Sequence, residues 1–179
     1  TMGIMKALCN RQYKVQGYKV GPDYIDPGFH SFICGIDSRN LDTHLMGEEG
    51  VKASFSRGKG DIAIVEGVMG FYDGMGLGTQ CSTAHVARII DLPVVLVLSP
   101  KAQMATLFAQ IKGILSYESN NIVGVILNNI SESYYRKLKI GIEKKCNLKV
   151  FGYLPRDPKV EIGSRSLGLI QTSEVKDLE

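Results

Sequence analysis

The sequence has few residues suited to redox or metal chemistry, and these residues are widely spaced. The cysteines are Cys9, Cys34, Cys81 and Cys146. No two of them form a C-x-x-C pair, so a zinc or redox motif is not indicated, and we expect four buried free thiols. The histidines are His30, His44 and His85. They also lack the spacing of metal ligands, so we expect them to be ordinary surface or core residues.

A large excess of charge and long apolar runs are also absent. The net charge of +3 over 179 residues is too small to indicate a nucleic-acid partner or a membrane surface, and it leaves only a weak attraction for a polyanionic small molecule. No apolar run approaches the roughly 18–20 residues of a membrane span, and the N-terminus has no signal-peptide pattern. With 44% hydrophobic and 22% charged residues, the composition predicts one soluble globular domain, and the free thiols are typical of a cytoplasmic protein.

The sequence does contain an alternation of strand-like and helix-like segments. The segments with the composition of strands are residues 13–20, 61–66, 93–99, 122–128 and 149–154. Three of these are near-continuous runs of Val, Ile and Leu, which is typical of strands buried on both faces of a parallel sheet. Helical spacing is found at residues 2–10, 84–90, 107–115 and 134–145. The alternation predicts an α/β fold with a doubly wound, mainly parallel sheet flanked by helices.

Polar or turn-forming residues follow each predicted strand. The first strand runs into Lys19 and Asp23. The second strand ends at Glu66, and the fourth ends at Asn128. In an open parallel sheet, ligands bind just beyond the carboxyl ends of the strands. We therefore expect Asp23, Glu66 and Asn128 to line one cleft.

Residues 19–30, KVGPDYIDPGFH, place two carboxylates three positions apart among prolines and glycines. Asp23 and Asp26 are either turn formers that cap backbone amides or acids held by a stiffened loop at the mouth of a phosphate site. Glu66 closes an apolar run and is expected to face the cleft, where a few carboxylates and phosphate oxygens together suit Mg²⁺. Asp73, in the Gly-rich loop that follows, is either another such acid or part of a β-turn.

Six motifs occur in the order found in a known family and cover nearly the whole chain. They are KVGPDYIDPGFH (19–30), SRNLDTHLM (38–46), VEGVMGFYDG (65–74), GVILNNI (124–130), GYLPRDP (152–158) and LGLI (167–170). With these motifs the sequence resembles the N-terminal, ATP-using domain of the cobyrinate a,c-diamide synthase family. The resemblance implies the fold of P-loop NTPases close to dethiobiotin synthetase, with residues 1–179 forming a single ATP-dependent synthetase domain.

The resemblance also implies a reaction. The family uses ATP and Mg²⁺ to convert the a and c carboxylates of a corrin macrocycle, cobyrinate, into amides through an acyl phosphate, a ligase reaction of cobalamin biosynthesis. The ammonia comes from glutamine, which a separate C-terminal glutaminase domain hydrolyses. We expect that domain and the family's G-x-G-K-T-T phosphate loop to lie outside residues 1–179, so this chain alone should be inactive. No nucleic-acid or membrane partner is expected, and a homodimer is left open.

Several residues match the family's functional positions within these motifs. Asp23 and Glu66 are the predicted metal ligands. Asp26 and Asp73 are predicted to act in phosphoryl transfer or in handling the intermediate. Lys19, at the end of the first predicted strand, is predicted to neutralise charge on phosphate or on the acyl phosphate. In this family positioning and charge neutralisation contribute more than a strong base.

Other positions match residues that contact the nucleotide or the macrocycle. Asn128 matches the position that recognises adenine, with the backbone of Leu154 and Pro155 nearby. The residues predicted to contact the macrocycle are Tyr24, Ile25, Arg39 and Asp42. For the segment of residues 39–42, a helix start capped by Asn or Asp is the alternative interpretation.

Other functions remain open at this point. Dethiobiotin synthetase and the amidase that acts on nickel sirohydrochlorin are related enzymes that also activate carboxylates with ATP, and corrin and sirohydrochlorin rings present similar acid arms. Cobyric acid synthase fits the Pro-Asp-Tyr-Ile-Asp run less well. A non-catalytic, partitioning-type ATPase switch is the alternative from another class. It predicts either a membrane-targeting helix or a dimer-forming lysine near the phosphate loop. The sequence has no amphipathic tail, which counts against the first, and the region of that lysine is expected to lie outside residues 1–179.

Overall fold

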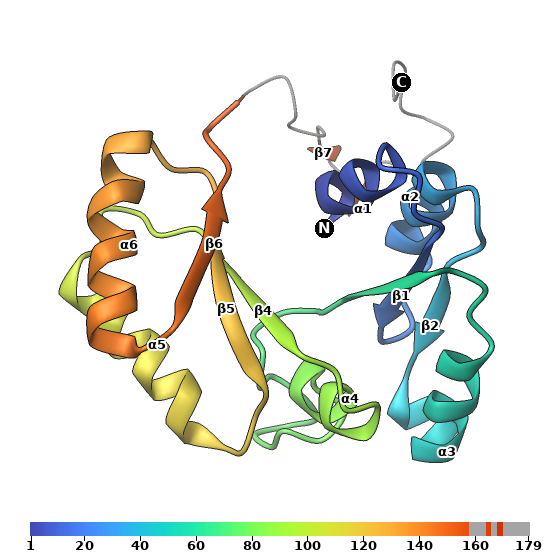
Figure 1. Ribbon diagram of the computed structural model, residues 1–179. Coiled ribbons are helices and arrows are strands. Elements are labelled where there is room, and N and C mark those ends of the chain that lie inside the picture. Colours follow the sequence, from blue (N-terminus) through green and yellow to red (C-terminus); the bar gives the residue numbers. More distant parts are fainter. Residues whose placement is uncertain (158–163, 166–167, 170–179) are drawn as a thin grey trace. The chain divides into compact units, whose positions relative to one another are not determined.

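The computed structural model describes residues 1–157, 164–165 and 168–169. The chain divides into two compact units, of which the first contains Thr1–Ile90 and the second begins at Asp91. In both units parallel strands alternate with helices (Figure 1), which confirms the predicted α/β class. The last residue of the motif at 152–158 and both end residues of the motif at 167–170 lie outside the described residues.

The first unit contains a parallel sheet with the strand order β2-β1-β3. Its strands are β1 (Val15–Val20), β2 (Arg39–Leu41) and β3 (Ile62–Glu66). Its helices are α1 (Met2–Cys9), α2 (Ile25–Cys34), α3 (Thr43–Ser56) and α4 (Thr83–Ile89). Helix α3 is interrupted at Gly47, whose φ of 66° lies in the left-handed region that glycine adopts readily. A short antiparallel pair, β7 (Ser164–Arg165) and β8 (Gly168–Leu169), follows later in the chain.

Strand β1 is buried along its whole length and is covered on both faces. One apolar core cluster consists of Tyr18, Val20, Leu41, Val51 and Val86, from β1, β2, α3 and α4. Successive side chains of a strand point to opposite faces, so Gly17 and Lys19 face away from this cluster. Helix α2 covers that second face, because a Cβ at Gly17 would lie 2.9 Å from the Cβ of His30.

Helix α2 begins inside the stretch that was predicted to be a stiffened loop, so that prediction is wrong from Ile25 onward. Pro27 is compatible with the helix because it lies in the first turn, where a backbone N–H has no intrahelical partner. Asp26 lies in the same turn, where its negative charge interacts favourably with the helix dipole. The helix ends at Gly35, whose φ of 66° forms a left-handed cap.

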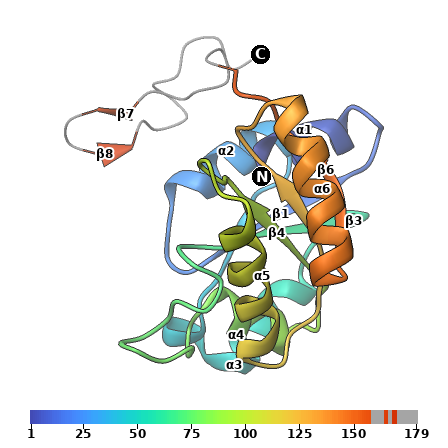
Figure 2. The ribbon, with the colours of Figure 1, turned by 90° about the vertical axis from the view of Figure 1, so that its left-hand side faces the viewer.

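The second unit contains a parallel sheet with the order β4-β5-β6. Its strands are β4 (Val94–Leu98), β5 (Ile122–Leu127) and β6 (Lys149–Tyr153), and its helices are α5 (Ala105–Tyr117) and α6 (Glu132–Cys146). Both helices lie along this sheet in Figures 1 and 2. These five elements agree with the segments predicted from the sequence, and Ser131 caps α6 by accepting a hydrogen bond from the Tyr134 amide.

Two further expectations from composition can be compared with the structure. All four cysteines are free thiols, but only Cys146 is buried, so the prediction of four buried thiols is wrong for the three that are half-buried. Within the described part of the chain, no helix combines the length and the apolar character that crossing a membrane requires.

Two helical glycines in the second unit lead to opposite expectations for alanine. A Cβ added at Gly113 of α5 would meet no atom within 4 Å, whereas a Cβ at Gly141 of α6 would overlap the ring of Phe108. Gly113→Ala should raise the free energy of unfolding by about 0.5–1 kcal/mol, because alanine loses less backbone entropy in a helix. Gly141→Ala should lower it by about 1–3 kcal/mol, because overpacking outweighs that gain. Urea denaturation of both variants checks this, and equal effects in one direction would contradict the described α5–α6 packing.

Candidate functional site

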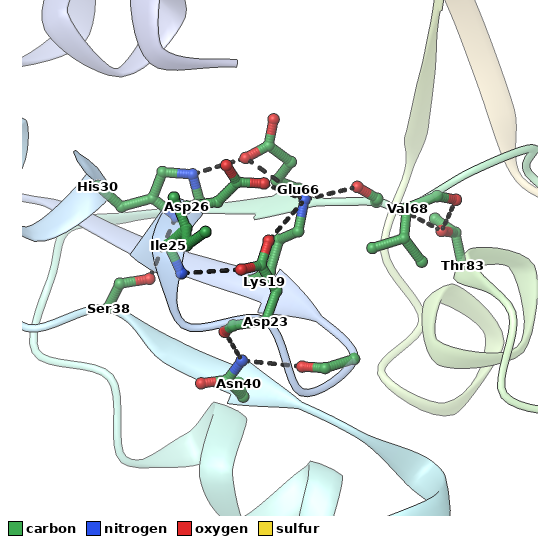
Figure 3. A network of polar contacts seen from close by, with 12 residues as sticks. Lys19, Asp23, Ile25, Asp26, His30, Ser38, Asn40, Glu66, Val68 and Thr83 are labelled. Carbon is green, nitrogen blue, oxygen red and sulfur yellow. Dashed lines mark hydrogen bonds and ion pairs between the residues drawn. The ribbon is translucent and has the colours of Figure 1, made fainter. Parts of the chain in front are cut away.

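The ammonium group of Lys19 lies at the centre of a polar cluster in the first unit (Figure 3). Lys19 of β1 is in register with Glu66 of β3, and its side chain is only 7% exposed. Lys19 Nζ is 2.5 Å from Asp26 Oδ2 and 3.9 Å from both Asp23 Oδ2 and Glu66 Oε2. It also donates a 3.3 Å hydrogen bond to the carbonyl of Gly67. The structure thus brings three carboxylates around one buried cation.

The two acids of the PDYID run lie just before and in the first turn of α2. Asp23 Oδ1 accepts a 2.8 Å hydrogen bond from the Ile25 amide, so this carboxylate forms the turn that leads into the helix. Its other oxygen is the one that faces Lys19, beyond hydrogen-bonding distance. Asp26 contacts Lys19 directly. The two interpretations of Asp23 are therefore compatible, because one oxygen caps the backbone and the other stays available in the cluster.

Asn40 holds the backbone that carries Asp23. Its Nδ2 donates to the carbonyls of Gly21, at 2.8 Å, and of Asp23, at 2.6 Å. Gly21 has a φ of 82°, a conformation that few other residues adopt without strain. Strand β2 therefore supports the loop between β1 and α2, and the position of the first acid depends on it.

Glu66 has an unusually acidic carboxyl group. Burial alone would raise its pKa, but hydrogen bonds from His30 and Thr1 and the positive charge of Lys19 outweigh this and lower the pKa from about 4.5 to about 2. The bond with His30 Nε2 is 2.7 Å long and involves Oε2, while Figure 3 shows the second oxygen pointing away from His30 and Lys19. Glu66 is therefore an anion throughout the physiological pH range, with one oxygen directed away from His30 and Lys19.

Asp73 is not brought into contact with Lys19. Its Oδ2 accepts a 2.9 Å hydrogen bond from the Gly70 amide, and its own amide donates to the Gly70 carbonyl at 3.1 Å, so it closes a turn, as the alternative interpretation predicted. This turn belongs to the loop that leaves β3. The start of that loop is held on α4, because the Val68 amide donates to Thr83 Oγ1 at 3.0 Å.

The residues predicted to contact the macrocycle are in different environments. Tyr24 is 73% exposed, next to the acids, and Ile25 is half-buried at the start of α2. Arg39 of β2 is in register with Tyr18 of β1, which is the neighbour of Lys19 in that strand. Because successive side chains point to opposite faces, Arg39 lies on the face of the sheet opposite to the Lys19 cluster. Asp42 is buried and caps α3, accepting from the amides of His44 and Leu45, which confirms the predicted helix start.

The predicted adenine-binding residues lie at the carboxyl ends of the strands of the second unit. The Asn128 amide donates to the Leu98 carbonyl, and Asn128 Nδ2 lies 3.3 Å from Ser99 Oγ. The Leu154 amide donates to the Leu127 carbonyl at 2.8 Å, which places Leu154 and the following Pro155 beside the end of β5. The three strand ends thus meet at one edge of this sheet. The expectation that Asn128 shares a cleft with Asp23 and Glu66 stays a prediction.

Reasoning from the sequence missed two polar residues that shape the cluster. His30 was expected to be an ordinary surface or core histidine, and it is fully buried but bonded to Glu66. Asn40 was considered only as part of a candidate macrocycle loop. The signal that could have identified His30 is its place seven residues after Asp23, at the end of the same motif. Nothing in the sequence marks Asn40 as the support of that loop.

The donor atoms of the cluster suit a magnesium ion that is shared with a nucleotide. Among residues 1–157 and the two short strands that follow, no group of three or more His, Cys, Asp or Glu side chains is arranged to hold a metal alone. Mg²⁺ in nucleotide sites requires only one or two carboxylates, because phosphate oxygens and water complete its shell. Asp23 Oδ2 and the outward oxygen of Glu66 are suitable ligands for such an ion. Because three carboxylates surround a single lysine, the cluster carries a net negative charge that attracts a cation.

Comparison with known proteins matches residues 38–162 to the AAA domain family AAA_26. Curated relatives are named cobyrinate a,c-diamide synthase. The relative from Clostridium tetani is 65% identical over 99% of this chain and 40% of its own length. The relative from Clostridium acetobutylicum is 59% identical over 99% of this chain and 41% of its own length. The relative from Salmonella typhimurium is 41% identical over 97% of this chain and 39% of its own length.

These findings confirm the resemblance that the six motifs indicated. Together with the parallel sheets flanked by helices, the family match also confirms the predicted P-loop NTPase-like class. The chain spans about two fifths of the length of the curated relatives it matches.

The acidic pKa of Glu66 predicts a pH dependence of stability. A carboxyl group whose pKa is lowered by folding stabilises the folded state at pH values above its unfolded pKa of about 4.5. This stabilisation is lost as the pH falls toward the folded pKa of about 2. For a carboxylate that is partly exposed, we expect the loss to be about 2 kcal/mol. Urea denaturation at several pH values should show wild type losing this stability relative to Glu66→Gln between pH 5 and pH 2. A difference between the two proteins that stays constant over that range would contradict the assignment.

Proposed function

This chain belongs to the AAA domain family, and we propose that it is the ATP-using part of an enzyme that amidates the a and c carboxylates of the corrin macrocycle cobyrinate. The observation that carries the proposal is the buried Lys19 ammonium surrounded by Asp23, Asp26 and Glu66 at the ends of parallel strands. This is the place where open parallel sheets bind ligands. The names of the relatives, which are 65% and 59% identical, supply the substrate class.

The proposed reaction is a ligation in two steps. A side-chain carboxylate of the macrocycle attacks the γ-phosphorus of ATP, which forms an acyl phosphate and releases ADP. Ammonia then attacks the acyl carbon, the amide forms, and phosphate leaves. Most of the catalytic contribution in phosphoryl transfer comes from positioning and charge neutralisation rather than from covalent chemistry of the protein.

In this reaction Lys19 neutralises negative charge on the transferred phosphate and on the acyl phosphate. Asp26 holds the ammonium group in place from 2.5 Å, and Gly67 limits its movement from the opposite side. Asp73 stands on the Gly-rich loop after β3, where its carboxylate can act on the intermediate once ligands are present. The cluster thus supplies one positive charge, held in place, and several negative charges within a few ångströms.

Asp23 and Glu66 would hold Mg²⁺ in the presence of the nucleotide. When bound, the ion would supply charge neutralisation at the phosphate oxygens. The protein's own contribution is to keep both carboxylates oriented. The Ile25 amide does this for Asp23, and the bond with His30 does it for Glu66.

The remaining predicted residues contact the other parts of the substrates. Asn128, with the backbone of Leu154 and Pro155, would recognise adenine at the strand ends of the second unit. Tyr24 and Ile25 would contact the macrocycle next to the acids, and Arg39 and Asp42 are more remote candidates. Glutamine-derived ammonia from a glutaminase domain, a cytoplasmic location and a homodimer in the full-length protein complete the proposal.

The proposal is tested with the full-length protein, cobyrinate, glutamine, ATP and Mg²⁺. Mass analysis should show the diamide, with one ADP formed for each amide. Asp26→Asn should lower kcat for amidation at least about 100-fold, because the buried lysine loses its closest counter-charge. Glutamine hydrolysis should change less than about twofold, because we place it in another domain. Failure of the wild type to form any amide would refute the proposed function. If Asp26→Asn instead loses amidation, glutamine hydrolysis and melting temperature together, Asp26 has only a structural role.

A further inference from the structure

His30 differs from an ordinary core histidine in its hydrogen bonds. Its side chain is 0% exposed, and both ring nitrogens have polar partners. Nε2 lies 2.7 Å from Glu66 Oε2, and Nδ1 lies 3.2 Å from Ser38 Oγ. Each nitrogen is therefore engaged by a different segment of the chain, one by the loop before β2 and the other by the end of β3. The ring, which belongs to α2, therefore connects these two segments.

The surroundings fix the ring in one place. Gly17 of β1 leaves the space for it, because a Cβ there would lie 2.9 Å from His30 Cβ and 3.2 Å from Ser38 Oγ. A glycine inside a strand weakens that strand, unless another group needs the room. Ser38 is held in turn, since its amide donates to Ser31 Oγ, and Ser31 Oγ donates to the Pro27 carbonyl. The imidazole therefore cannot move away from Glu66 without breaking several of these contacts.

The bond from His30 also decides which way the Glu66 carboxylate turns. Glu66 lies at the last position of β3, and its side chain is 23% exposed. Lys19 is 3.9 Å away and does not form a direct hydrogen bond with it. The close contact with Nε2 holds Oε2 toward His30, and the other oxygen points away from both His30 and Lys19, as Figure 3 shows.

We infer that His30 is a positioning residue for the proposed amidation, which orients the Glu66 carboxylate toward the bound nucleotide and its metal ion through the chain Ser38–His30–Glu66. The inference rests on the proposed function. Hydrogen-bond partners of metal-binding carboxylates commonly contribute 10- to 100-fold to affinity or activity. His30 touches neither the reacting atoms nor the macrocycle, so its effect should appear in kcat and in metal-dependent nucleotide binding, and not in the KM for cobyrinate.

Two substitutions of similar polarity separate orientation from packing. In His30→Asn the amide occupies the position of Nδ1, so it can keep the contact with Ser38 but does not reach Glu66. In His30→Gln the amide nitrogen reaches the position of Nε2 and can donate to Glu66 again. In the full-length protein we expect His30→Asn to lower kcat about 10- to 100-fold, with the KM for cobyrinate within about twofold of wild type. His30→Gln should recover most of the loss.

A second readout does not depend on turnover. Isothermal titration calorimetry with a non-hydrolysable ATP analogue should show that the gain in affinity caused by Mg²⁺ is reduced about tenfold or more in His30→Asn and restored in His30→Gln. Gly17→Ala, which alters no polar group, should act in the same direction by displacing the ring. His44→Asn, an exposed histidine on α3, serves as the matched control and should resemble wild type.

The outcomes distinguish the inference from the proposed function. If His30→Asn and His30→Gln lose activity and melting temperature to the same extent, the ring contributes only packing. If activity and melting temperature are unchanged in both variants, Glu66 does not depend on His30 for its orientation. Either result overturns the inference. If the wild type fails to amidate cobyrinate, the proposed function fails, while the calorimetric comparison still decides whether His30 orients Glu66 for a nucleotide and its metal ion.

Discussion

A lysine ammonium group that has lost almost all contact with water determines how the polar residues of the first unit are arranged. Lys19 is 6% exposed, and an unpaired charge at such a site costs several kcal/mol, so opposite charges and carbonyl oxygens must replace the lost water. Asp26 and the Gly67 carbonyl do so directly, and Asp23 and Glu66 add further negative charge. The start of α2 and the loop after β3 must both stay close to β1 to satisfy this one group.

The other buried polar side chains of β1 and α2 follow the same logic. Gln16 donates to the Asp37 carbonyl and accepts from the Lys59 amide, so it connects two loops that are far apart in the sequence. His30 connects the loop before β2 with the end of β3. Buried polar groups without partners are costly, so each of these residues favours one arrangement of the chain over others with similar apolar contacts. The same network that specifies the fold thus also orients the carboxylates of the site.

The sequence predicted the elements of the second unit well, because its strands are apolar runs of ordinary length and its helices have regular apolar spacing. It predicted the first unit less well, for two physical reasons. Strand β2 has only three residues, too few for a period to be recognised. Helix α2 carries Pro27 in its first turn, and a proline flanked by Asp26 and Gly28 has the composition of a loop.

The acids of the Lys19 cluster could be predicted from the sequence, but their partners could not. Asp23 and Asp26 follow the first predicted strand and Glu66 ends the second, and strand ends meet at one edge of a parallel sheet. The pairing of Lys19 with Glu66 depends on the register between β1 and β3, which no local pattern specifies. The contact of His30 with Glu66 depends on how α2 packs on that sheet. Such contacts between distant segments require coordinates.

The most direct test of this account is the coupling between Lys19 and Asp26, measured with the variants Lys19→Met, Asp26→Asn and the double variant. Removing one partner of a buried ion pair leaves a charge without compensation, whereas removing both does not. We expect the free energies of unfolding to give a coupling energy of about 1.5 kcal/mol or more, so that the double variant is more stable than the sum of the single effects implies. Additive effects of the two substitutions would contradict the account, because the buried ammonium would then not organise the cluster.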